Sequence, residues 1–198
     1  MEVRDASARL IALPTGGSLR VLVDVSVQSL ALDRTTNTPV VILQELEGDR
    51  VLPIWIGPGE ASAIAMQLAD MEFERPLTHD LLCSVLKGLG GALQKVIITK
   101  VEQSTYYAEL IVRRNGEVFS LDARPSDSIA VALRVQARIF ADDELLEEAT
   151  IEIADEETVA DMNIDFTATV EPEVVMGPEE LQAHLRRLNP EDFGRFKP

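Results

Sequence analysis

The chain has 198 residues, a single cysteine and a formal net charge of −16 at pH 7. That length suffices for one well-buried domain with or without an appendage, and one cysteine excludes an internal disulfide. No apolar run is long enough to cross a bilayer and the first residues lack a secretory pattern, so we expect a cytoplasmic protein with no membrane partner.

The first part of the chain predicts a leader followed by strands. Residues 1–18 contain Pro and Gly without sustained periodicity, which indicates a flexible leader. Residues 19–32 alternate apolar and polar side chains, as a half-buried strand does. Two further strands are expected at 39–46 and 50–56, joined by a hairpin, and helical spacing follows at 60–71.

A second helix is expected after a loop, with Thr78 as its N-cap and Asp80 in its first turn. Its apolar face comprises Leu81, Leu82, Val85, Leu86 and Leu89. Three strands then follow at 95–102, 106–113 and 117–122, and the last two are joined by an Asn-Gly hairpin signal.

The third helix follows a strand-to-helix turn at residues 122–127. Pro125 keeps Arg124 extended, and Ser126 is the expected N-cap, with Asp127 favourably placed at the positive end of the helix dipole. A short strand at 139–140 and a short helix capped by Asp142 complete the domain.

An internal repeat links the two halves of the chain. Without gaps, residues 48–60 lie over residues 115–127, and both copies run strand, hairpin, strand, Pro-containing turn and acid-capped helix. We therefore predict an α+β domain over residues 19–153, with a mainly antiparallel sheet, helices on one face and two related halves. Residues 154–198 are predicted to be an acidic C-terminal extension with a short helix, suited to a protein partner.

Two polar junctions carry the candidate chemistry. One holds Arg75, Thr78, His79 and Asp80 at the head of a helix, and the other holds Asp122, Arg124, Ser126 and Asp127. A helix N-terminus and a bidentate arginine both suit a phosphate, and histidine transfers protons near neutral pH. The carboxylates of Asp80, Asp122 and Asp127, with Glu60 as a further candidate, are ligands of the type that Mg²⁺ or Mn²⁺ prefers.

Each of these residues also has a structural interpretation. Asp80 and Asp127 stand where helix-capping acids belong, and Arg124 is able to form a purely structural ion pair with Asp122 or Asp127. Glu60 occupies the position of Asp127 in the first repeat copy, which favours a shared capping role.

The stretch Asp122-Ala123-Arg124-Pro125-Ser126-Asp127-Ser128-Ile129-Ala130, preceded by Arg75-Pro76-Leu77-Thr78-His79-Asp80-Leu81, resembles the bifunctional nuclease domain family. The resemblance runs from about Val21 to about Ile153. It implies a duplicated β-α-β-β layout and a metal-dependent nuclease of low sequence specificity, acting on DNA and RNA. In that interpretation the carboxylates hold the metal, Arg75 or Arg124 steadies the phosphate, and His79 transfers a proton.

The charge balance favours a different class of function. Proteins that bind nucleic acid use Lys and Arg to neutralise phosphates, and this chain has 18 of them against 34 acids. The competing hypothesis is therefore a non-catalytic, oligomeric binding or regulatory domain whose acidic tail meets a protein partner. In either case, exposed apolar strand faces predict a homo-oligomer.

Overall fold

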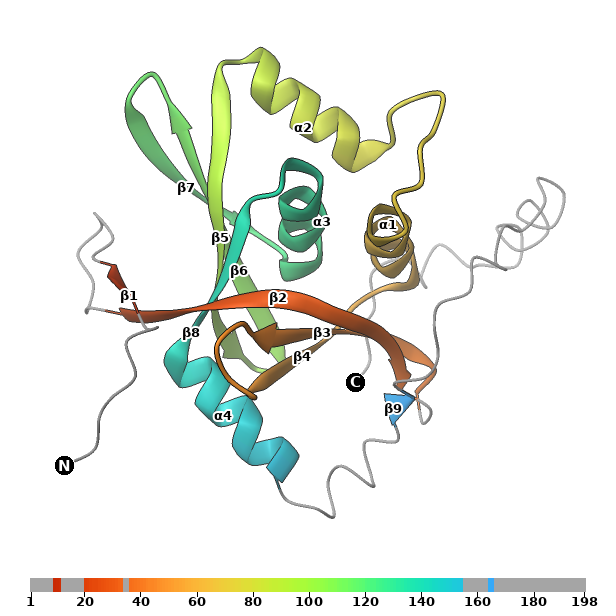
Figure 1. Ribbon diagram of the computed structural model, residues 1–198, viewed down its shortest axis with the longest axis vertical. Helices are drawn as coiled ribbons and strands as arrows, with labels where there is room; N and C mark the ends of the chain where they lie inside the picture. Colours follow the sequence, from red (N-terminus) through yellow and green to blue (C-terminus); the bar gives the residue numbers. More distant parts are fainter. Residues whose placement is uncertain (1–8, 12–19, 34–35, 155–163, 166–198) are drawn as a thin grey trace, which may run out of the picture. The chain divides into compact units, whose positions relative to one another are not determined.

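The computed structural model describes residues 9–11, 20–33, 36–154 and 164–165. The strands form one sheet in the order β4-β3-β2-β8-β5-β6-β7, with β1 and β9 both paired to β2 (Figure 1). The pair of β5 and β8 is parallel and the others are antiparallel, which confirms the predicted mainly antiparallel α+β fold. The strands are β1 (Arg9–Ile11), β2 (Arg20–Asp33), β3 (Thr38–Glu45), β4 (Val51–Trp55), β5 (Gly91–Glu102), β6 (Thr105–Arg114), β7 (Glu117–Ala123), β8 (Arg138–Asp142) and β9 (Ile164–Asp165).

Strand β2 joins the two parts of the sheet. One stretch of β2 pairs with β3 and an overlapping stretch pairs with β8, with a register shift between Val27 and Ser29. The shift marks a bulge just beyond the end of the β8 ladder, and a bulge increases the local bend and twist of the strand. Alternate side chains of β2, β5 and β8 then face opposite sides, and those on the helix side join the larger buried cluster.

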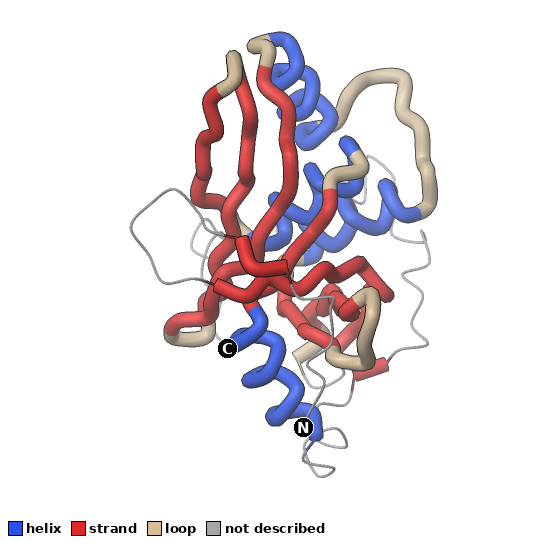
Figure 2. Tube along the Cα trace, turned by 60° about the vertical axis from the view of Figure 1, so that its left-hand side comes forward, coloured by secondary structure: helices blue, strands red, loops and turns tan. Residues whose placement is uncertain are grey.

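The helices pack against one face of the sheet. Helix α1 (Pro58–Leu68) and helix α2 (Thr78–Gly88) both contact helix α3 (Pro125–Val135), which lies on β5 and β6. Helix α4 (Asp143–Ala154) packs on β4 and β2 and adds Leu145 and Leu146 to the same core. Figure 2 shows α1, α2 and α3 beside the β5–β6–β7 part of the sheet.

The predicted helix caps require correction. The N-cap of α3 is Arg124 and not Ser126, because Pro125 already occupies the first helical position and Ser126 is buried in the first turn. The N-cap of α2 is Leu77 and not Thr78, and the Asp80 carboxylate accepts the Leu77 N–H at 2.8 Å. The acids were therefore placed in the correct turn, whereas each helix begins earlier than predicted.

The apolar stripe predicted for α2 is present but is not buried. No residue of α2 is buried, and Leu81, Leu82, Val85 and Leu89 are each 45–60% exposed. By contrast, the corresponding residues of α3 are enclosed, with Ile129 fully buried. Helix α2 thus rests on α3 along one side and leaves most of its apolar surface uncovered.

Several predictions fall at the margins of the described chain. Strand β1 lies inside the predicted leader, and β9 lies inside the predicted C-terminal extension. The helix expected within that extension lies outside the described residues. The series β3-β4-α1 and β6-β7-α3 both run strand, strand, helix, while the duplication of two halves stays a prediction. Among the described helices, none is long and apolar enough to cross a membrane.

Candidate functional site

A cavity of about 520 Å³ lies between α2, α3 and the β6–β7 hairpin. Apolar side chains form one part of its lining, among them Leu82, Leu110 and Val131. The polar part comprises Thr78, His79, Thr105, Tyr106, Tyr107, Asp122, Arg124 and Asp127. The cavity therefore combines an apolar and aromatic wall with a group of ionisable side chains, as ligand sites commonly do.

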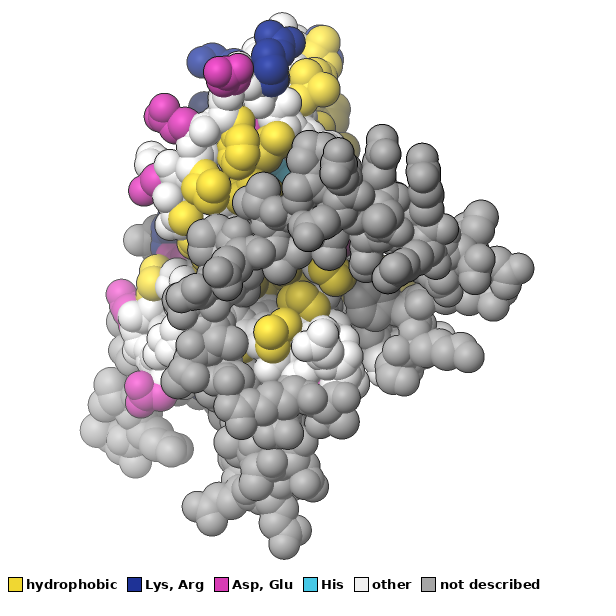
Figure 3. All heavy atoms as spheres, turned by 90° about the vertical axis from the view of Figure 1, so that its right-hand side faces the viewer, with side chains coloured by type: hydrophobic (Ala, Val, Ile, Leu, Met, Phe, Trp, Pro, Cys, Tyr) yellow, Lys and Arg dark blue, Asp and Glu magenta, His cyan; other side chains and the backbone are white. Residues whose placement is uncertain are grey.

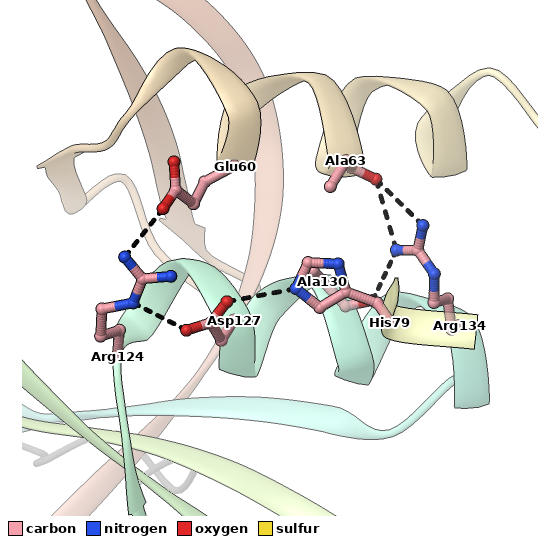
Figure 4. Close-up of polar contacts among 7 residues, drawn as sticks. All are labelled: Glu60, Ala63, His79, Arg124, Asp127, Ala130 and Arg134. Carbon is pink, nitrogen blue, oxygen red and sulfur yellow. Dashed lines mark hydrogen bonds and ion pairs between the residues drawn. The ribbon is translucent and has the colours of Figure 1, made fainter. Parts of the chain in front are cut away.

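A chain of charged contacts runs across the helix N-termini at this cavity (Figure 4). His79 Nε2 lies 3.2 Å from Asp127 Oδ1, and Arg124 Nε donates to Asp127 Oδ2 at 2.7 Å. The same guanidinium donates from its NH1 group to Glu60 Oε1 at 2.8 Å. Arg124 thus bridges Glu60 and Asp127, the two acids that occupy equivalent positions in the predicted repeat.

The electrostatics of this chain keep Asp127 ionised. Burial by itself raises the pKa of the Asp127 carboxyl, but hydrogen bonds from Arg124 and His79 outweigh it and lower that pKa below its usual value. The hydrogen bond to Asp127 correspondingly raises the pKa of Arg124. The ionised Asp127 carboxylate contacts His79 Nε2, and this contact orients the imidazole ring.

Asp80 belongs to a separate cluster. Its carboxylate accepts a hydrogen bond from Arg134 Nε at 2.5 Å, and Arg134 NH1 also donates to the carbonyls of Ala63 and Ala130. Burial raises the pKa of Asp80, while the Leu77 N–H and Arg134 lower it, and the net direction is downward. Asp80 and Arg134 therefore tie α1, α2 and α3 together, and neither lines the cavity.

The structure separates the predicted site residues into two sets. His79, Asp122, Arg124 and Asp127 all border the cavity, and Glu60 joins them through Arg124. Arg75 is exposed in the segment before α2 and does not line the cavity. Of the residues that do line it, Leu82 and Val131 look like ordinary core positions in the sequence, since the spacing of an amphipathic helix gives no sign of a cavity.

The predicted metal ligands do not form a cluster as they lie. Among the described residues, no three His, Cys, Asp or Glu side chains are placed to hold a metal ion. Asp80 is engaged by Arg134, and Asp127 is engaged by Arg124 and His79. Asp122 is one of the residues that line the cavity, and it is paired with Glu109 in the β6–β7 ladder. Because Mg²⁺ is commonly held by one or two carboxylates together with waters and substrate phosphates, the metal role of these acids stays a prediction.

Comparison with known proteins identifies the family of this domain. A bifunctional nuclease domain matches residues 41–154, a range that includes every side chain of both charged clusters. An uncharacterized protein of Mycobacterium tuberculosis is 41% identical over 170 residues, which cover 86% of this chain and 97% of that protein.

Plant proteins are more distant relatives. Bifunctional nuclease 1 of Oryza sativa subsp. indica is 27% identical over 110 residues, covering 54% of this chain and 33% of that protein. Bifunctional nuclease 2 of Oryza sativa subsp. japonica is 26% identical over 144 residues, covering 70% and 44% respectively. The chain thus spans less than half the length of these plant relatives. From the domain match and the extent of the mycobacterial similarity, this chain belongs to the bifunctional nuclease domain family.

Proposed function

We propose that this protein hydrolyses phosphodiester bonds of DNA and RNA at the cavity between α2 and the β6–β7 hairpin. The observation that carries the proposal is the hydrogen-bonded series His79–Asp127–Arg124 along the cavity. Asp127 thereby contacts both the imidazole of His79, which is able to transfer a proton, and the guanidinium of Arg124, which is able to bind a phosphate. The plant relatives of the domain are named bifunctional nucleases.

The proposed roles follow from the contacts. His79, oriented by the ionised Asp127, accepts a proton from an attacking water as the new P–O bond forms. The ester P–O bond then breaks, and the departing oxygen takes up a proton from the histidine. Arg124 contacts a phosphate oxygen, because its side chain is 65% exposed. The hydrogen bonds from its Nε to Asp127 and from its NH1 group to Glu60 fix the plane of the guanidinium.

The wall of the cavity suits a substrate of varied sequence. Tyr106, Tyr107 and Leu82 line it, and flat or apolar surfaces stack on any nucleobase with little preference. Low sequence specificity is therefore part of the proposal.

Metal dependence remains an expectation. The acids at the site outnumber the cations, since Glu60 and Asp127 both contact Arg124 and Asp122 also lines the cavity, so an approaching phosphate gains from an added divalent cation. Because the described carboxylates form no metal cluster, the steps above rest on the side chains of this chain alone.

The test is nuclease activity on single- and double-stranded DNA and RNA, with Mg²⁺, Mn²⁺ or EDTA. Compared with wild type, we expect His79→Ala and Asp127→Asn to lose about 10²–10⁴-fold in rate, the usual contribution of a general acid or base. Asp49→Asn, an exposed acid in the β3–β4 turn, is the matched control and should retain full activity. Equal activity in all four proteins would indicate a contaminating nuclease and refute the site.

A further inference from the structure

Lysine and arginine side chains without an acidic partner gather at one end of the domain. Lys87 lies in the last turn of α2, Lys95 lies in β5, and Arg113 and Arg114 end β6. Among the described residues, these four cations take part in no ion pair. We call these four residues the basic end. Figure 3 shows Lys and Arg side chains gathered at the top of the view, where Figure 1 places the α2–β5 connection and the β6–β7 hairpin.

The basic end lies on both faces of the β6–β7 hairpin. Successive side chains of β6 point to opposite faces, and Leu110 packs on the helix-side core while Ile111 belongs to the cluster on the other face. By this alternation Arg114 lies on the side of α2, which carries Lys87. Arg113 lies on the helix-free face, together with Lys95, whose ladder partner is Ile111.

The positive charge at the basic end is not neutralised locally. Lys87, Arg113 and Arg114 are exposed. Glu117 is the acid opposite Arg114 in the β6–β7 ladder, yet among the described contacts the two side chains form no ion pair. In a chain whose net charge is −16, this surplus of positive charge marks a surface that gains from an anionic ligand.

Lys95 has the least favourable surroundings of the four cations. It is half-buried, and burial lowers the pKa of its ammonium group. Its partner in the β5–β8 ladder is Arg138, and both cations lie over the Phe140 ring, at 5.4 and 4.9 Å from the ring centre. Like charges directly opposite each other are unfavourable, and Asp24 is paired with Arg138 and not with Lys95. An anion at this end would relieve that repulsion.

The same two elements connect the basic end to the cavity. Helix α2 begins with Thr78 and His79, which line the cavity, and Lys87 is in its last turn. Strand β6 begins with residues 105–107, which also line the cavity, and it ends with Arg113 and Arg114. At about 1.5 Å per helical residue and about 3.3 Å per strand residue, the two sites are roughly 12–20 Å apart.

We propose that the basic end is a second contact site for nucleic acid, which binds backbone phosphates of a strand whose scissile bond lies in the cavity. This inference rests on the proposed function, because the ligand is the substrate of that site. At about 3.4 Å per stacked nucleotide, the separation corresponds to about four to six nucleotides.

The chemistry of the basic end favours a nucleic acid over an acidic polypeptide. A guanidinium binds a phosphate through two parallel hydrogen bonds, and Arg113 and Arg114 place two guanidinium groups on opposite faces of one hairpin. Contacts to phosphates carry no sequence information, which agrees with the low specificity proposed for the cavity. The local charge also explains how a strongly acidic chain is able to hold a polyanion.

The first experiment measures binding without catalysis. Fluorescence anisotropy of the full chain with a single-stranded oligonucleotide of about 12 nucleotides, in EDTA and about 50 mM salt, gives the Kd. We expect the double variant Arg113→Gln/Arg114→Gln to bind at least about tenfold more weakly, and each single variant at least about threefold. The slope of log affinity against log salt should become shallower by about 1.4 in the double variant, because each contact with a single strand contributes about 0.7.

Arg20→Gln is the matched control for the single variants. It removes the same charge from an exposed arginine at the start of β2, outside the basic end, and should bind within about twofold of wild type. Far-ultraviolet circular dichroism confirms that all variants are folded. Absence of binding by wild type, or binding unaffected by the double substitution, would overturn the second contact site. Equal binding of poly-glutamate would overturn nucleic acid as its ligand.

Cleavage assays separate this inference from the proposed function. On the longer oligonucleotide, the double variant should lose at least about tenfold in kcat/KM, mainly through KM. On a dinucleotide, which is too short to span the roughly 12–20 Å, it should match wild type. His79→Ala should show the reverse pattern, with normal binding and slow cleavage of both substrates. Binding that depends on Arg113 and Arg114 without any cleavage by wild type would refute the nuclease proposal and leave the second contact site standing.

Discussion

The Asp80–Arg134 contact allows a structural acid to be distinguished from a functional one. The Arg134 side chain is 6% exposed, and it binds the Asp80 carboxylate together with the carbonyls of Ala63 and Ala130. Asp80→Asn keeps the shape of the side chain and an acceptor for the Leu77 N–H, but it leaves the buried guanidinium without its counter-charge. We therefore expect a loss of stability with no direct effect on the cavity.

The magnitude follows from the burial of the pair. Breaking a fully buried ion pair costs about 3–5 kcal/mol, and a hydrogen bond to a charged group contributes about 1.5–3 kcal/mol. The Asp80 side chain is 34% exposed, so water offsets part of the loss and about 2–3 kcal/mol in the free energy of unfolding is expected. For a domain of this size that corresponds to about 5–10 °C in Tm.

Urea and thermal unfolding of wild type, Asp80→Asn and Asp127→Asn provide the assay. The Arg124–Asp127 pair is far more exposed, with Arg124 at 65%, so Asp127→Asn should cost less than about 1 kcal/mol. A double-mutant cycle with Arg134→Met should return a coupling energy of about 1–3 kcal/mol. The reasoning is wrong if Asp80→Asn is as stable as wild type, or if the two Asn variants lose equal stability.

Three further predictions concern other groups. The pKa of the Asp127 carboxyl is lowered in the folded protein, so its contribution to the free energy of unfolding is present above the ordinary pKa of about 4 and is lost as pH falls through the folded pKa. The stability difference between wild type and Asp127→Asn should therefore vanish below that range in urea titrations. A constant difference at all pH values would contradict this prediction. Leu146 is fully buried between α4 and the sheet, so Leu146→Ala should lower the free energy of unfolding by about 2–5 kcal/mol in the same assay, whereas a change under 1 kcal/mol would show that this part of the core collapses around the gap. Burial raises the pKa of the Cys83 thiol, so at pH 8 it should react with a disulfide reagent more slowly than free cysteine does, and a faster reaction would contradict the assigned environment.

The sequence alone determined most of the local structure. The alternation over residues 19–32 predicts β2 nearly to its ends, and the Asn115-Gly116 signal predicts the β6–β7 hairpin, where both residues have positive φ. These features depend on side chains a few positions apart, so periodicity and turn chemistry suffice to predict them. The helix caps were misplaced by one or two residues: Pro125 already takes the first position of α3, so Arg124 is its N-cap, and Leu77 is the N-cap of α2.

The sequence named candidates that border the cavity and the Arg124–Asp127 ion pair, but it did not predict the contacts between distant parts of the chain. Motifs identified His79, Arg124 and Asp127, whereas the contact of Arg124 with Glu60 joins residues 64 positions apart and that of Arg134 with Asp80 joins residues 54 apart. Such pairs are set by the way α1, α2 and α3 pack, which no local pattern contains. For the same reason the sequence predicts an apolar stripe on α2 without indicating what covers it. Periodicity gives the apolar face of a helix, and the tertiary structure decides whether that face meets the core or remains open beside the edge of the sheet.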